Sequence, residues 1–115
     1  MKARTKALGL RTFRLVDALP RTHSADIIGR QLLRSATSVG ANYRAACRAK
    51  STADFIAKMG IVDEEADETT FWLEVIIDAK LMDEALVGEL LNECNEIVSI
   101  VVTSIKTARG GVRIK

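Results

Sequence analysis

Hydrophobic positions recur every three or four residues along nearly the whole chain, which is the period of amphipathic helices. The clearest stripe lies within residues 24–49 and consists of Ile28, Leu32, Ala36, Val39, Tyr43 and Cys47. The alternation typical of half-buried strands is rare, and Pro20 is the only proline in 115 residues. This pattern predicts an all-α fold.

Breaks in the period divide the chain into four expected helices. The first spans residues 5–19 and ends at Pro20. The second spans residues 24–49, with Ser24 as its N-cap. The third runs from Ser51 or Thr52 to about Lys80, and the fourth follows Asp83 as its cap. Their expected buried stripes are Leu8, Phe13, Leu15, Val16 and Leu19; Phe55, Met59, Val62, Ala66, Thr70, Leu73 and Ile77; and Leu86, Leu90, Leu91, Cys94, Ile97, Val98, Val101 and Ile105.

Short connections between these helices predict that sequential neighbours run antiparallel. The expected architecture is therefore an up-down-up-down four-helix bundle. Residues 1–109 form its single domain, and residues 110–115 form a basic, flexible tail after the glycine pair.

Charge is divided between the two halves of the chain. Residues 1–50 carry eleven basic and two acidic residues, a net charge of +9, whereas residues 51–115 carry six basic and thirteen acidic ones, a net charge of −7. The net charge of +2 hides this division. A basic half favours an anionic partner, and the acidic half offers one within the molecule or in another copy of it.

The charges also fall on helical stripes. One narrow arc of the second predicted helix carries Arg30, Arg34, Arg44 and Arg48, and one arc of the third carries Asp63, Asp67, Glu74 and Asp78, flanked by Glu64 and Glu68. Guanidinium groups bind carboxylates or phosphates bidentately. The arginines, with Lys50, Arg11 and Arg14, therefore either grip a nucleic-acid backbone or pair with the acidic stripe. The acidic residues are numerous enough for complete pairing, which favours ion pairs on the stripes alone.

Several function classes find no support in the sequence. The lone His23 lies in a predicted loop without a partner for acid–base chemistry, and Cys47 and Cys94 are expected to be small buried groups rather than zinc ligands. No apolar run is long enough for a membrane span, and the basic N-terminus does not resemble a signal peptide. We expect a non-enzymatic cytoplasmic protein without cofactor or metal. Gly40 and the small residues around it predict a close helix approach.

Three ordered runs resemble one bacterial protein family. They are QLLRSATSVGANYRAA at 31–46, STADFIAKM at 51–59 and VDEEADETTFWLE at 62–74. The chain is similar there to four-helix-bundle proteins encoded in intervening sequences of the large-subunit ribosomal RNA gene. The first predicted helix departs from the family pattern, since only Leu19-Pro20 stands where members have an aromatic-Pro segment.

The resemblance implies an antiparallel four-helix bundle that assembles as a ring-shaped homopentamer. It also implies similarity to accessory proteins of diversity-generating retroelements, which bind nucleic acid and a reverse transcriptase. On the matching positions it implies a polar network, between helices or between subunits, formed by Arg34, Asn42, Glu65, Glu68 and Trp72.

Two interpretations remain open from the sequence. The first is an oligomeric bundle that contacts RNA or DNA through Arg30, Arg44, Arg48, Lys50, Arg11 and Arg14. The second is a structural homo-oligomer or protein-binding adaptor whose charges are consumed by salt bridges. Only the first predicts a cationic surface that remains unpaired.

Overall fold

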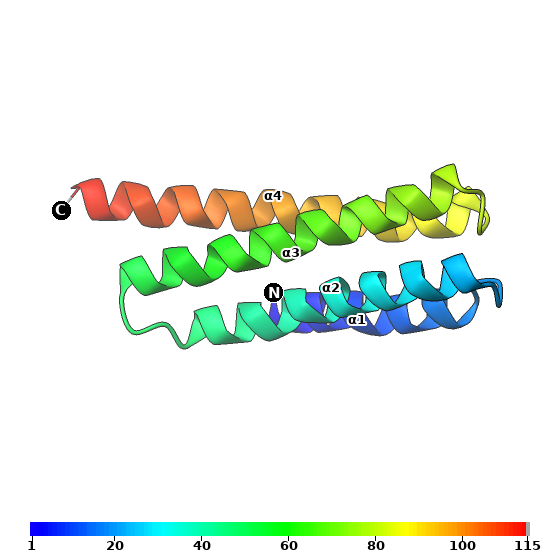
Figure 1. Ribbon diagram of the computed structural model, residues 1–115. Coiled ribbons are helices and arrows are strands. Elements are labelled where there is room, and N and C mark those ends of the chain that lie inside the picture. Colours follow the sequence, from blue (N-terminus) through cyan, green and yellow to red (C-terminus); the bar gives the residue numbers. More distant parts are fainter. Residues whose placement is uncertain (115) are drawn as a thin grey trace.

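Four antiparallel helices make up the chain, and no strand occurs within residues 1–114. The computed structural model describes the backbone of residues 1–114 and the side chains of residues 1–110. The helices are α1 (Lys2–Asp17), α2 (His23–Cys47), α3 (Thr52–Asp78) and α4 (Glu84–Ile114) (Figure 1). The prediction of an all-α, four-helix fold is therefore confirmed.

Side-chain caps fix where three of the helices begin. The Thr22 hydroxyl accepts a hydrogen bond from the Ala25 N–H at 3.2 Å, and Ser51 accepts one from the Asp54 N–H at 3.0 Å. The Asp83 carboxylate accepts one from the Ala85 N–H at 3.1 Å. These bonds satisfy amide groups that have no partner within their own helix. The expectation of Ser24 as the cap of α2 is wrong, because Thr22 holds the extended backbone that capping needs.

The buried apolar side chains form one continuous core. Three residues that were predicted to be buried in it are exposed instead. Phe13 is 47% exposed and Leu86 is 60% exposed, and Cys47 is exposed as well. On α1, the positions facing α2 are instead Thr5, Gly9 and Thr12. A threonine can be buried there because its hydroxyl bonds to its own helix, as Thr12 does to the Leu8 carbonyl at 2.7 Å.

The first helix is too short to cover the whole length of the bundle. With 16 residues, α1 is much shorter than α2, which has 25, and α4, which has 31. It packs mainly on α2 and meets α4 through Arg4, whose guanidinium lies 2.6 Å from both Glu93 and Glu96 carboxylates. The rod measures 53 × 21 × 20 Å, and α1 covers only one part of its length (Figure 1).

The predicted tail at residues 110–115 is only partly covered by the structure. Helix α4 continues through Ile114, past the glycine pair where we expected the domain to end. Lys115 and the side chains of 111–114 lie outside the described residues, so flexibility of this segment stays a prediction. Within residues 1–114, no helix combines the length and apolarity needed to cross a bilayer.

Glycine at position 40 allows the backbones of α1 and α2 to approach closely. A Cβ placed there would lie 3.4 Å from the carbonyl carbon and oxygen of Thr5, whereas a Cβ at Gly60 would meet nothing within 4 Å. The Gly40→Val substitution should therefore push α1 away and lower the free energy of unfolding by about 1–3 kcal/mol. Gly60→Val is the matched control and should change it by less than about 0.5 kcal/mol. Urea unfolding measures both, and equal effects would contradict the α1–α2 packing.

Candidate nucleic-acid interface

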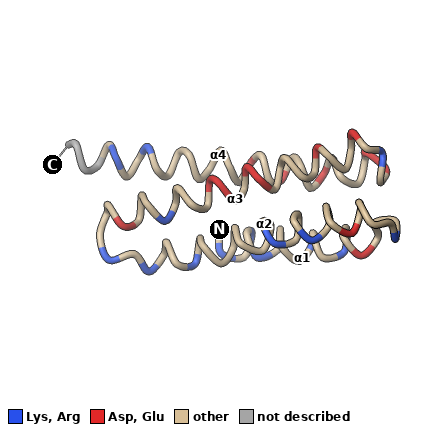
Figure 2. Tube along the Cα trace, in the orientation of Figure 1, with Lys and Arg blue, Asp and Glu red and all other residues tan. Residues whose placement is uncertain are grey.

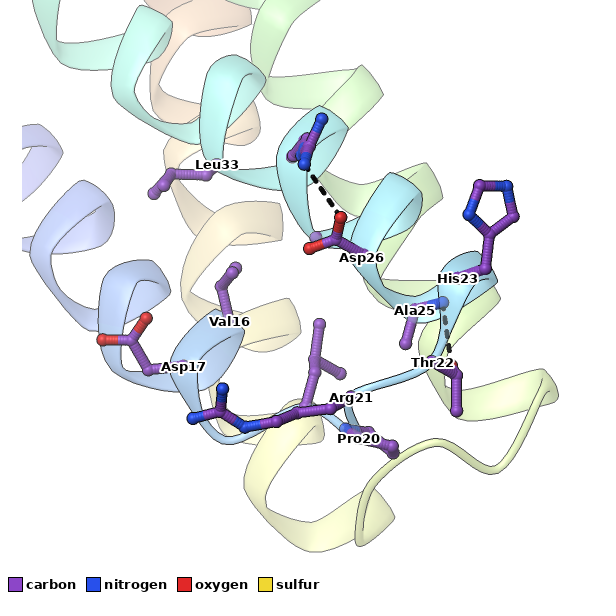
Figure 3. A pocket seen from close by; sticks show the side chains of 12 residues that line it. Val16, Asp17, Pro20, Arg21, Thr22, His23, Ala25, Asp26 and Leu33 are labelled. Carbon is purple, nitrogen blue, oxygen red and sulfur yellow. Dashed lines mark hydrogen bonds and ion pairs between the residues drawn. The ribbon is translucent and has the colours of Figure 1, made fainter.

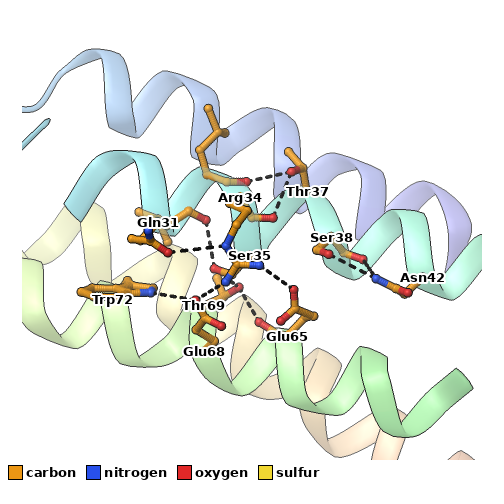
Figure 4. Close-up of polar contacts among 12 residues, drawn as sticks. Gln31, Arg34, Ser35, Thr37, Ser38, Asn42, Glu65, Glu68, Thr69 and Trp72 are labelled. Carbon is orange, nitrogen blue, oxygen red and sulfur yellow. Dashed lines mark hydrogen bonds and ion pairs between the residues drawn. The ribbon is translucent and has the colours of Figure 1, made fainter. Parts of the chain in front are cut away.

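Arg34 of α2 is held by two carboxylates of α3. Its Nη1 donates to Glu65 at 3.0 Å and its Nη2 donates to Glu68, while the indole N–H of Trp72 donates to Glu68 at 3.1 Å (Figure 4). Arg34 first, and Trp72 second, hold the pKa of Glu68 below its usual range. The pair therefore stays charged at neutral pH, and Arg34 has little capacity left for an external anion.

A buried hydrogen bond lies beside this cluster. The hydroxyls of Ser35 and Thr69 are 3.0 Å apart, and both residues are fully buried. This contact marks the register of α2 against α3, while each hydroxyl also donates to a carbonyl of its own helix, Ser35 to Leu32 and Thr69 to Glu65.

Asn42 does not join the Arg34 cluster. Its side-chain amide donates to the Ser38 carbonyl at 2.8 Å and to the Ser38 hydroxyl at 3.2 Å, one turn earlier on the same helix (Figure 4). The structure thus brings four of the five predicted network residues together, and Asn42 is satisfied locally. Whether any of them meets another subunit stays a prediction.

Arg30 pairs within its own helix. Its guanidinium lies 2.9 Å from Asp26, and both side chains are largely exposed. The two residues line a pocket of about 480 Å³ at the α1–α2 corner, from which His23 points away (Figure 3). A local exposed pair of this kind is weak, so Arg30 keeps part of its capacity for phosphate.

The remaining cations of α2 and of the loop after it have no acidic partner among the described side chains. Arg44, Arg48 and Lys50 are exposed, and none forms an ion pair with a carboxylate among the described side chains. Lys2 and Lys6 of α1 are unpaired in the same sense, and both line a groove with Arg44. We call these five residues the α1–α2 cationic surface. Figure 2 shows basic residues along the C-terminal end of α2 and the loop that leads into α3.

Antiparallel register explains why this end of α2 is unpaired. Counting from the Ser35–Thr69 contact, Arg44 comes level with Gly60, and Arg48 with Ile56. The only carboxylate in the first eleven residues of α3 is Asp54, which accepts from Lys58 at 2.9 Å and from the Lys50 N–H at 3.0 Å. Within one chain, the acidic stripe therefore does not neutralise all four arginines, and pairing between copies stays a prediction.

Arg11 and Arg14 lie elsewhere. They line a groove between α1 and α4 with Leu86 and Glu89, apart from Arg44. The charge of Arg11 also contributes to lowering the pKa of Glu93, although Arg4 has the larger effect. The six predicted nucleic-acid-binding residues therefore do not form one patch. Sequence reasoning missed Arg4, and no local signal could have found partners 89 and 92 positions away.

These observations define a class of protein: a charge-segregated four-helix bundle with an unpaired cationic surface on its N-terminal half. Comparison with family models then identifies the family. Residues 2–103 match the model described as 23S rRNA-intervening sequence protein, and the chain belongs to that family.

A solved structure supports the same assignment. The chain is 34% identical to a protein of unknown function from the S23 ribosomal protein family of Bacteroides thetaiotaomicron VPI-5482, with a TM-score of 0.85. The similarity covers 91% of this chain and 97% of that one. Among curated proteins, none matches this chain.

The Arg34 cluster should contribute to stability in a pH-dependent way. Arg34→Ala leaves the largely buried Glu65 and the half-buried Glu68 without their cation, and should lower the free energy of unfolding by about 1 kcal/mol at pH 7 after solvent screening. Because the folded pKa of Glu68 is lowered, its contribution is complete above the unfolded pKa of about 4.3 and is lost as pH falls through the folded value. The difference between wild type and Arg34→Ala should shrink accordingly.

Denaturant unfolding at several pH values between 7 and 3 would measure this difference. Arg44→Ala is the matched control, because it removes an arginine from the same helix that holds no described carboxylate. A constant difference across this pH range, or an equal loss in the control, would contradict the assignment.

Proposed function

We propose that this protein is a non-catalytic RNA-binding bundle that contacts phosphates through the α1–α2 cationic surface. The observation that carries the proposal is the contrast between paired and unpaired cations. Arg4, Arg30 and Arg34 hold carboxylates, whereas Lys2, Lys6, Arg44, Arg48 and Lys50 hold none among the described side chains. When exposed, unpaired cations contact phosphates, the counterions condensed on the nucleic acid are released, and this release favours binding.

RNA is the favoured nucleic acid because the family is described by its connection to 23S ribosomal RNA. DNA binding through the same phosphate contacts is the less favoured form of this function. Phosphate contacts position a nucleic acid without reading its sequence, so the surface by itself supports affinity more than specificity.

Removing two cations of this surface should weaken RNA binding and its salt dependence together. We expect wild type to bind a structured RNA hairpin with an affinity that falls steeply between about 50 and 200 mM salt. The double variant Arg44→Ala with Arg48→Ala should reduce the magnitude of the log–log slope by about 1.4 to 1.8, which corresponds to two phosphate contacts. Fluorescence anisotropy across a salt titration measures this slope.

The matched control removes two cations from the opposite end of the bundle. Arg21→Gln with Lys80→Asn gives the same charge change, and Asn tolerates the left-handed backbone of Lys80, whose φ is 55°. Its slope should equal that of wild type. Equal losses in the two double variants would indicate a diffuse field rather than this surface, and absence of binding at low salt would leave the structural or adaptor role.

We also propose that copies of the chain associate, with the five-membered ring implied by the family resemblance as the expected assembly. Two large apolar side chains are exposed on α3, where Ile61 is 45% and Phe71 is 52% accessible. Acidic residues of the same helix surround them in sequence, namely Asp63, Glu64, Asp67 and Glu74. A face of this kind complements basic residues of another copy that lie outside the α1–α2 cationic surface, such as Arg11 and Arg14, and such a head-to-tail contact can close into a ring.

Placing a charge among these apolar residues should disrupt the assembly. We expect Ile61→Asp with Phe71→Asp to shift the native mass to that of the monomer, because an added carboxylate is unfavourable in an acidic, apolar interface. Ile27→Asp is the control, since Ile27 is similarly exposed at 48% but lies on α2. Native mass spectrometry and light scattering would measure the outcome. A monomeric wild type, or an unchanged mass in the double variant, would contradict this part of the proposal.

A further inference from the structure

The groove between α1 and α2 carries charges of one sign only. Its volume is about 590 Å³, and its charged lining residues are all cations: Lys2, Lys6 and Arg44. None of the three is paired with a carboxylate among the described side chains.

The floor of the groove is formed by backbone and very small side chains. Gly9, Gly40 and Ala41 line it, and the two helices approach so closely at Gly40 that a Cβ there would touch the Thr5 carbonyl. Because no large side chain fills this space, a flat group can enter it between the flanking cations.

An aromatic ring stands in the same groove. Phe13 is 47% exposed, and its neighbour along the groove, Leu10, is 52% exposed. The other exposed phenylalanine, Phe71, already contacts Trp72 edge to face at 4.9 Å between ring centroids, the only aromatic pair within the described residues. Phe13 has no aromatic partner within the described residues, and it lines the same groove as cations that suit phosphates.

We propose that this groove binds an unpaired RNA nucleotide, with its base against Phe13 and the adjoining phosphates on Lys2, Lys6 and Arg44. The inference deepens the RNA-binding function proposed above and rests on it. Bases within a duplex are stacked on each other, so a protein aromatic ring reaches them in loops, bulges and single strands. The preferred ligand is thus a hairpin loop or single strand rather than a blunt duplex.

The acidic face of α3 in a second copy is the competing occupant of the groove. Its carboxylates suit the three cations, and its exposed Ile61 and Phe71 suit the apolar ring of Phe13. The open floor of glycine and alanine favours the nucleotide, because a flat base enters it more readily than a helix does. The experiment distinguishes the two occupants.

The test compares Phe13→Leu with Phe71→Leu. Leucine keeps an apolar side chain at each position and removes the aromatic face, and the two phenylalanines are almost equally exposed. The probes are an RNA hairpin with 2-aminopurine in its loop and a blunt duplex with the same stem.

Wild type should bind the hairpin more tightly and quench the loop fluorescence. Phe13→Leu should lose roughly 5- to 150-fold in hairpin affinity and most of the quenching, with its duplex affinity and native mass unchanged. Phe71→Leu should bind both probes as wild type does.

Each other outcome overturns the inference in a recognisable way. Unchanged hairpin affinity in Phe13→Leu, or wild-type binding without quenching, removes base stacking and leaves the phosphate-binding function standing if the salt dependence persists. A change of native mass in Phe13→Leu assigns the groove to contact between copies. Absence of hairpin binding by wild type at low salt ends both this inference and the proposed function.

Discussion

The register of α2 against α3 determines where charge is neutralised in this molecule. The buried hydroxyl pair of Ser35 and Thr69, 3.0 Å apart, marks that register, and the Arg34 guanidinium meets Glu65 and Glu68 directly beside it. In an antiparallel pair, each residue toward the C-terminus of α2 faces an earlier residue of α3. Because all carboxylates of α3 except Asp54 follow position 62, they lie opposite residues 26–41 of α2. The last turn of α2 and the loop after it face only Asp54, which Lys58 already holds. The packing of α2 against α3 therefore explains both the neutralised cluster of Arg34, Glu65 and Glu68 and the unpaired arginines at the end of α2.

The same pairing gives α1 a limited role. This helix has a face of threonine and glycine toward α2, and its Thr5 backbone lies against Gly40. Leu8 and Leu15 anchor α1 in the apolar core, and Arg4 clamps the helix to Glu93 and Glu96 of α4. The buried stripe of α1 consists of Thr5, Leu8, Gly9, Thr12 and Leu15, and Leu10 and Phe13 lie outside it. The exposed ring is thus a consequence of how α1 packs.

Much of the fold could be predicted from the sequence, because the signals are local. Pro20, the polar residues before each helix and the period of three or four fix four helices and their order, and the motifs at 31–74 indicate the family. What could not be predicted depends on contacts distant in sequence. Hydropathy assigns Phe13 to the core, whereas the structure buries Gly9 and Thr12 and leaves Phe13 exposed. Comparing the number of carboxylates with the number of arginines likewise does not predict that Arg44 and Arg48 are unpaired within the chain. Such a comparison does not say which acid lies opposite which arginine.

A net charge of only +2 is compatible with binding a polyanion because of this separation. Arg48 comes level with Ile56, seven residues from Asp63, or about 10 Å along the helix axis, and the nearer Asp54 is already held by Lys58. The Debye length at physiological ionic strength is about 8 Å, so a phosphate near Arg48 is shielded from most of the acidic part of α3. At about 0.01 M salt the Debye length grows to about 30 Å, and the acidic residues of the 53 Å rod then act on the same phosphate. The field that a nucleic acid meets is therefore local at physiological salt, and the placement of the cations matters more than their excess over the acids.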